Sequence, residues 1–234
     1  CAERLIPVQL ELGGKDAAVV AADADLERTA RGIVWGAFVN SGQTCASIER
    51  VYVERPLYQK LIDRMVELTN ELKVGPPTDD DTDLGPLTTR GQRDIVDEHV
   101  RAALAAGATA LTGGKRPEGK GFYYPPTILV NTTDDMDVIV EETFGPVMPV
   151  IPVDSLDEAI RRANDSKFGL TASGWTTSAA TAERLQRELA AGVVADVAGR
   201  RADEPGHGVL FHVLAHVEAD HVLLGVEQRG RERL

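Results

Sequence analysis

Three short segments carry the residues that could perform covalent chemistry. The segment NSGQTCAS places Cys45 on a polar turn that is marked by Gly42. The segment LELGGK places Glu11 between two leucines, and EETFGPV places Glu142 directly before a turn that contains Gly and Pro. A catalytic cysteine reacts as the thiolate, so it requires a nearby base, a lowered pKa, or both. The alternative for Cys45 is a small buried side chain without a chemical role.

The base for such a cysteine is more readily a carboxylate than a histidine in this sequence. Outside the last part of the chain the one histidine is His99, which lies in the middle of a long amphipathic segment where we expect a surface residue. Glu11, half-buried among apolar neighbours, would have a raised pKa and could act as a base near neutral pH. Taken singly, Glu11 could also be a strand-end residue and Glu142 a surface-turn residue, so both interpretations stay open.

Taken together, the three segments resemble the aldehyde dehydrogenase superfamily. They occur in the order of that family, with 34 residues from Glu11 to Cys45 (45 − 11) and 97 from Cys45 to Glu142 (142 − 45). The stretches GPL, GGK, PPTIL and FGLTASGWT add to the similarity. The resemblance covers about residues 1–194, which is most of the chain.

The resemblance implies oxidation of an aldehyde to a carboxylic acid with NAD or NADP as the cofactor. Cys45 would attack the aldehyde to give a thiohemiacetal, and loss of hydride would leave a thioester. Glu11 would be the general base that activates water for hydrolysis, which favours an acid product over transfer to coenzyme A. Glu142 would contact the nicotinamide ribose, with Phe144 beside it. The backbone N–H of Cys45 would be one oxyanion donor.

Alternating strand-like and helix-like segments must position these residues. The sequence predicts strands at 16–20, 48–53, 127–131, 148–153 (partly broken by Pro152), 170–176 and 192–197, with amphipathic helices at about 25–40, 56–73, 88–106, 155–164 and 178–191. This alternation predicts an α/β fold with a mostly parallel open sheet and helices on both faces. The resemblance implies an architecture like the catalytic domain of an aldehyde dehydrogenase.

Three regions follow from this interpretation. Residues 1–15 are predicted to be the end of a dinucleotide-binding domain, residues 16–194 the catalytic domain, and residues 195–234 a divergent tail that is disordered or frameshifted. The glycine-bearing turn that meets a pyrophosphate is not seen in the sequence. We therefore expect the 234-residue chain by itself to show no measurable NAD-dependent aldehyde oxidation. In the tail, His212 and His216 would share a helix face, but we expect no metal site there.

The amino-acid composition limits the classes of molecule that we expect this chain to bind. The chain is 43% hydrophobic and carries a formal net charge of −12, which argues against nucleic acid or an anionic membrane as a partner. It has no apolar run of membrane-spanning length, and its two cysteines make no disulfide framework, so we expect a cytoplasmic protein. The expected partner is a small-molecule aldehyde. Members of the family are usually homo-oligomers, an expectation that we do not extend to this chain.

Two other functions remain open at this point. The chain could be a non-catalytic remnant or assembly module, in which case iodoacetamide would label Cys45 no faster than a free thiol. It could also be an NAD-independent thiol esterase that uses Cys45 and Glu11, because thioester hydrolysis is half of the dehydrogenase chemistry. The residues indicate neither the aldehyde nor the choice between NAD and NADP.

Overall fold

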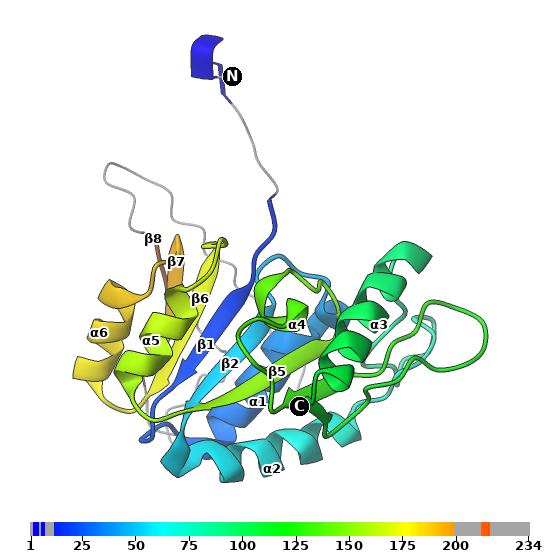
Figure 1. Cartoon of the computed structure of the whole chain (residues 1–234), viewed down its shortest axis with the longest axis horizontal. Coiled ribbons are helices and arrows are strands. Elements are labelled where there is room, and N and C mark those ends of the chain that lie inside the picture. Colours follow the sequence, from blue (N-terminus) through cyan, green and yellow to red (C-terminus); the bar gives the residue numbers. More distant parts are fainter. Residues whose placement is uncertain (1, 5, 8–11, 199–211, 216–234) are drawn as a thin grey trace.

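A single twisted sheet forms the centre of the molecule (Figure 1). The computed structural model describes residues 2–4, 6–7, 12–198 and 212–215. Within these residues the sheet has eight strands in the order β3-β4-β5-β2-β1-β6-β7-β8. The strands are β1 (Asp16–Val20), β2 (Ile48–Glu54), β3 (Thr109–Ala110), β4 (Thr127–Val130), β5 (Val147–Val153), β6 (Thr171–Thr176), β7 (Val193–Ala198) and β8 (His212–Ala215). The six strands from β4 to β7 in this order are parallel, and β3 and β8 add antiparallel edges. The predicted mostly parallel open sheet is confirmed.

The helices begin where the sequence offers a capping side chain. Asp25, Thr89, Ser155 and Ser178 each accept a hydrogen bond from a backbone N–H of the first turn that follows. The helices are α1 (Leu26–Phe38), α2 (Arg55–Glu71), α3 (Arg90–Ala105), α4 (Asp137–Val140), α5 (Leu156–Asn164) and α6 (Ala179–Glu188), with short 3₁₀ segments η1 (Ala2–Arg4) and η2 (Val39–Gly42). Pro56 lies in the first turn of α2, where its missing N–H leaves no helical bond unmade.

Successive residues of the central strands point into two different cores. In β1, Ala18 and Val20 pack with α1 and α2 on one face, whereas Ala17 and Val19 pack with α3, α5 and α6 on the other. All five residues of β1 are buried. Figure 1 shows β1 in the middle of the sheet with helices in front of it and behind it. A strand that is covered on both faces explains why DAAVV does not alternate between polar and apolar residues.

Two expectations for the regular elements are wrong. Pro152 does not break β5, because β5 pairs with β4 over Val147–Pro149 and with β2 over residues 150–153, so only one edge of the strand is in a ladder at Pro152. The expected helix around His212 is instead the strand β8, which pairs with β7. The sheet also continues past residue 195, since β7 ends at Ala198. His207, His216 and His221 lie outside the described residues.

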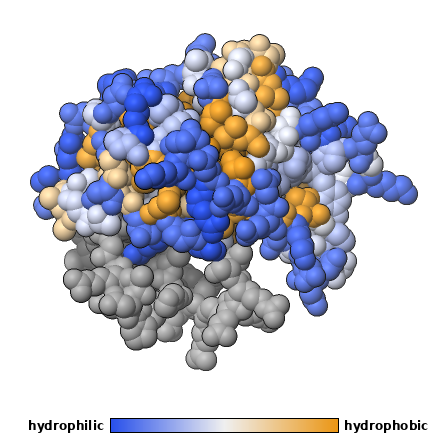
Figure 2. All heavy atoms as spheres, turned by 90° about the horizontal axis from the view of Figure 1, so that it is seen from below, coloured by the Kyte–Doolittle hydropathy of each residue, from blue (hydrophilic) through white to orange (hydrophobic). Residues whose placement is uncertain are grey.

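The face of the molecule that Figure 2 shows is mainly polar where the structure describes it. Figure 2 shows hydrophilic side chains over most of the face seen from below, the side on which α2 lies in Figure 1, with apolar patches between them. Among the described helices, none has both the length and the apolar character needed to cross a membrane.

Candidate active site

Cys45 lies at the surface, just after a turn of residues with left-handed backbone conformation. Asn40, Ser41 and Gly42 have φ values of 54°, 56° and 71°, and together they reverse the chain between α1 and β2. Gly42 is required here for a second reason, since a Cβ at this position would lie 2.2 Å from the carbonyl oxygen of Gly145. Cys45 follows this turn as an exposed, unpaired thiol. The alternative of a small buried side chain is therefore wrong for Cys45.

The Gly13–Gly14 backbone runs between Cys45 and Glu142. The Gly14 N–H donates to Glu142 Oε1 at 2.8 Å. A Cβ on Gly13 would lie 2.4 Å from the Glu142 carboxylate oxygens, and a Cβ on Gly14 would lie 2.5 Å from the Cys45 carbonyl oxygen. Only residues without a side chain fit in this gap. The three sequence segments that suggested chemistry are thus brought into contact.

The Glu142 carboxyl group is half-buried, and burial raises its pKa above the ordinary value. The Gly14 N–H and the nearby Lys15 oppose this shift, whereas Glu49 adds to it. Glu142 Oε1 is bound by Gly14, and Oε2 has no hydrogen-bond partner among the described residues. One carboxylate oxygen is therefore available to a hydroxyl group from outside the chain.

Phe144 adopts an unusual backbone conformation two residues after Glu142. Its φ is +49°, in a region that non-glycine residues rarely occupy. Its N–H donates to Glu49 Oε1 at 2.8 Å, and its carbonyl oxygen accepts from Gln92 Nε2 at 3.1 Å. These contacts hold the strained turn from both sides, as is common at binding sites.

A buried ion pair beneath the site was missed by sequence analysis. Lys15 Nζ lies 2.6 Å from Glu49 Oε2, and the exposed fractions of the two side chains are 0% and 3%. Lys15 also donates to Thr143 Oγ1 at 3.2 Å. Burial lowers the pKa of Lys15, and Glu49 opposes that shift. The sequence offers one signal, since Glu49 and Arg50 are charged residues within the strand-like segment IERVYV, but the burial of Glu49 does not follow from it.

The expectation of a surface position for His99 is wrong. His99 is half-buried on α3, and its Nδ1 lies 3.2 Å from Thr143 Oγ1. Burial and the positive charge of Lys15 lower the pKa of His99, so the neutral imidazole is favoured at pH 7. His99 thus belongs to the polar cluster under the Glu142 turn. The structure gives it no contact with Cys45.

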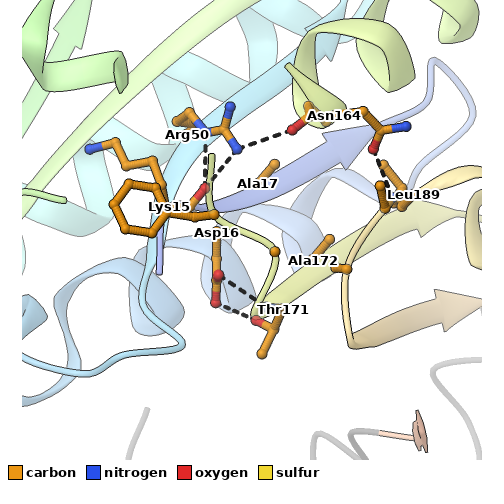
Figure 3. Close-up of a pocket in the computed structure, with 13 residues that line it drawn as sticks. Lys15, Asp16, Ala17, Arg50, Asn164, Thr171, Ala172 and Leu189 are labelled. Atoms are coloured by element: carbon orange, nitrogen blue, oxygen red, sulfur yellow. Dashed lines mark hydrogen bonds between the residues drawn. The ribbon is translucent and has the colours of Figure 1, made fainter. Parts of the chain in front are cut away.

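A second set of polar contacts joins the residues at the start of β1 to the neighbouring strands β2 and β6 (Figure 3). The Arg50 guanidinium donates to the Lys15 carbonyl oxygen through Nε and Nη2, at 2.9 and 2.7 Å. Asp16 accepts hydrogen bonds from the backbone N–H and the hydroxyl group of Thr171. These groups line a cavity of about 10 Å³ with Asn164, which is room for about one water molecule. The first residues of β1 are therefore fixed to both neighbouring strands.

Asp16 gives a prediction about pH. Burial raises its pKa to about 6, although Thr171 opposes the shift. Between about pH 4 and pH 6 the folded chain retains this proton and the unfolded chain loses it, so Asp16 lowers the free energy of unfolding as pH rises through this window. We expect Asp16→Asn to remove this loss. From pH 4 to pH 7 the free energy of unfolding of the variant should gain up to about 3 kcal/mol relative to the unsubstituted chain, as measured by urea denaturation.

A surface aspartate provides the control for this measurement. The hydroxyl group of Thr133 lowers the pKa of the exposed Asp135, so ionisation of Asp135 favours the folded state as pH rises. Asp135→Asn should change the pH dependence in the opposite direction to Asp16→Asn. Identical profiles for Asp16→Asn and the unsubstituted chain would contradict the assignment of Asp16 as a buried acid.

The outcome for the predicted site residues is mixed. Cys45, Glu142 and Phe144 lie on turns that the structure brings together around Gly13 and Gly14. Glu11 lies outside the described residues, so its role as a general base stays a prediction. The side-chain N–H of Asn40, in the turn before Cys45, donates to the Gln43 carbonyl oxygen.

Comparison with known proteins agrees with this geometry. The family model described as "Aldehyde dehydrogenase family" matches residues 1–207. The chain belongs to the aldehyde dehydrogenase family. Lactaldehyde dehydrogenase from Escherichia coli is 44% identical over 176 residues, which cover 75% of this chain and 37% of that protein. Succinate-semialdehyde dehydrogenase [NADP(+)] from Mycobacterium avium is 41% identical over 192 residues, which cover 82% of this chain and 41% of that protein.

Solved aldehyde dehydrogenase structures have the same fold. A crystal structure of lactaldehyde dehydrogenase from Escherichia coli superposes with a TM-score of 0.80 at 40% identity and covers 86% of this chain and 42% of that chain. An NAD+ complex of aldehyde dehydrogenase from Bacillus cereus superposes with a TM-score of 0.80 at 38% identity and covers 86% and 41%. This aldehyde dehydrogenase chain therefore spans about two fifths of the length of these relatives.

Proposed function

We propose that this chain supplies the nucleophile and part of the nicotinamide site of an NAD- or NADP-dependent aldehyde dehydrogenase. The observation that carries the proposal is the contact of three turns: exposed Cys45, the Gly13–Gly14 backbone and the Glu142 carboxylate lie against one another. Family membership and the relatives that act on lactaldehyde and succinate semialdehyde support the reaction class. The substrate is a small-molecule aldehyde.

Cys45 starts the reaction as the thiolate, which forms when the thiol proton passes to solvent and then adds to the aldehyde carbon. The new C–S bond converts the neutral carbonyl group into a tetrahedral oxyanion, from which loss of hydride is much easier than from the aldehyde itself. The backbone N–H of Cys45 is one donor for that oxyanion. The exposed position of Cys45 leaves its thiol accessible to a substrate that approaches from outside the sheet.

A nicotinamide cofactor supplies the hydride acceptor when it is bound. Glu142 would hold such a cofactor through Oε2, which has no hydrogen-bond partner among the described residues, because a carboxylate oxygen beside the cysteine turn can accept a hydrogen bond from a ribose hydroxyl group. Phe144 lies two residues after Glu142 in the same turn, and we expect it to border the cofactor as well. Glu11 then acts as the general base: it removes a proton from water, which hydrolyses the Cys45 thioester to the acid and returns the thiol.

The test separates the acyl-transfer half of the reaction from oxidation. In a Cys1→Ser background, p-nitrophenyl acetate should release a burst of one nitrophenol per chain and leave an acetyl thioester on Cys45, detected by peptide mass spectrometry. Cys45→Ala should show neither. Glu11→Gln should form the thioester and hydrolyse it about 100-fold more slowly, since a general base contributes a factor of this order. A burst that persists in Cys45→Ala would contradict the assignment.

Oxidation is measured with the same proteins by NADH formation from an aldehyde. Acylation of Cys45 together with binding of NAD+ or NADP+ would support the dehydrogenase assignment. Steady ester turnover by a chain that binds neither NAD+ nor NADP+ would instead support an esterase. Absence of any reaction at Cys45 would support a non-catalytic module.

A further inference from the structure

One buried carboxylate, on the strand that follows the cysteine turn, binds residues next to the Gly13–Gly14 segment and in the Glu142 turn. Glu49 is four residues after Cys45, at the buried start of β2, and is 2% exposed. Its Oε1 accepts from the Phe144 N–H at 2.8 Å. Its Oε2 accepts from the Thr143 N–H at 2.8 Å and from Lys15 Nζ at 2.6 Å. Hydrogen bonds from an ammonium group and two backbone amides therefore meet on a single side chain.

Gly14 and Lys15, which follow each other in the chain, are hydrogen-bonded to Glu142 and Thr143, which also follow each other. Gly14 donates its N–H to Glu142, and Lys15 donates its ammonium group to Thr143 Oγ1 and to Glu49. Glu49 in turn holds the backbone of Thr143. These contacts form a closed ring, and Glu49 is the member of the ring that belongs to β2, the strand that follows the cysteine turn.

The Glu142 turn needs such support, because its own backbone conformation is unfavourable. Phe144 has a φ of +49° two residues after Glu142. A non-glycine residue keeps this conformation only where the surrounding contacts determine it. The two N–H groups that Glu49 binds are those of Thr143 and Phe144, the residues that lead into and occupy the strained position.

We infer that Glu49 is a positioning residue, which fixes the Glu142 carboxylate beside Gly14 through Lys15 and the backbone of Thr143 and Phe144. The proposed function gives the consequence, since a displaced Glu142 would no longer present Oε2 to a nicotinamide ribose. Glu49 itself touches neither Cys45 nor Glu142 through a hydrogen bond. Its effect on the site must therefore be transmitted through the ring.

Residue-resolved hydrogen exchange tests this transmission without any nucleotide. Glu49→Gln keeps the shape of the side chain and removes its charge. The amide of Gly14, which binds Glu142 and not Glu49, should exchange about tenfold faster in Glu49→Gln, the scale expected when charge-assisted hydrogen bonds are lost. The amides of β1 should keep their exchange rates, which shows that the change is local and not global unfolding.

The neighbouring Glu141 offers a matched control. It lies in the same turn, but its carboxylate faces solvent and pairs with Lys167. Glu141→Gln should leave exchange at Gly14 within about twofold of the unsubstituted chain. If Glu49→Gln speeds exchange at Thr143 and Phe144 and leaves Gly14 unchanged, Glu49 supports only its own contacts and the inference is overturned.

A second pair of variants decides the question if Glu49→Gln does not fold. Thr143→Val removes the hydroxyl group that accepts from Lys15 and contacts His99, and Thr143→Ser retains it. Thr143→Val should speed exchange at Gly14, and Thr143→Ser should restore the slow rate. Equal rates in both variants would overturn the inference.

The same proteins are then titrated with NAD+ and NADP+. Glu49→Gln should weaken nucleotide binding by a factor similar to that of Glu142→Gln if Glu142 contacts the nucleotide. A chain that binds no nucleotide but shows the expected exchange at Gly14 would contradict the cofactor role of Glu142 and leave the positioning role supported. The two proposals can therefore fail separately.

Discussion

Replacement of Lys15 with methionine should lower the free energy of unfolding by about 3–5 kcal/mol, because it leaves a buried carboxylate without its counter-charge. Lys15 and Glu49 are in contact at 2.6 Å, and both side chains are almost completely shielded from water. The two backbone N–H groups on Glu49 remain in the variant, but they cannot supply the missing positive charge. Urea denaturation at neutral pH measures the loss.

An exposed lysine provides the control for this prediction. Lys167 pairs with Glu141 at the same 2.6 Å distance, but the exposed fractions of these side chains are 56% and 46%. Lys167→Met should therefore cost no more than about 1 kcal/mol. The double variant Lys15→Met/Glu49→Gln should recover a large part of the loss, since no buried charge remains. Equal losses in Lys15→Met and Lys167→Met would show that the buried pair has no special importance.

Replacement of Gly42 with alanine should be the second strongly destabilising change. A φ of +71° costs an L-residue about 1–2 kcal/mol. The added Cβ would also lie 2.2 Å from the carbonyl oxygen of Gly145, and backbone atoms must separate to relieve this overlap. Overpacking of this kind adds about 1–3 kcal/mol. We expect a total of roughly 3 kcal/mol, with altered alkylation of Cys45 because the cysteine turn moves away from the Glu142 turn.

Gly91 is the matched control for Gly42. It lies in the first turn of α3, and the nearest atom to an added Cβ is Thr89 Oγ1 at 4.0 Å. Gly91→Ala should keep or raise stability by about 0.5–1 kcal/mol, because alanine is the better helix residue. A Gly42→Ala variant that unfolds at the same urea concentration as Gly91→Ala would refute the proposed close contact of the two turns.

The sequence predicted the parts of the fold that depend on local signals. The run DAAVV predicts β1 because it is short, apolar and β-branched, and Asp25 predicts the start of α1 because its side chain caps the first turn. The failure at Pro152 has a tertiary cause, since the cost of a proline in a strand depends on which edge is paired. The secondary structure at His212 was mispredicted because it depends on pairing with β7, a contact that exists only in the folded chain.

In the candidate site, too, local sequence signals predicted some residues, whereas others depend on tertiary contacts. Cys45 and Glu142 stand out by residue type and by the turns that carry them, and the structure brings these turns together. Lys15 and Glu49 do not stand out, because a lysine after two glycines and a glutamate in a strand are ordinary surface residues in most sequences. Their burial follows from the approach of residue 143, which lies 128 residues away from Lys15 in the chain. No local pattern carries that information.

The position of β1 in the sheet has a consequence for how the chain reaches this structure. β1 precedes β6 in the chain by about 150 residues, yet the two strands pair. Ala17 therefore gains its second neighbouring strand only after Ala172 has been synthesised. Contacts of such long sequence separation slow folding, because the chain must close a large loop before any of them forms. During synthesis, β1 can join β2 long before β6 emerges, and its other edge stays unpaired meanwhile. We expect the bond between Asp16 and Thr171 to be among the last to form and the Gly13–Gly14 segment to be vulnerable to proteases until then.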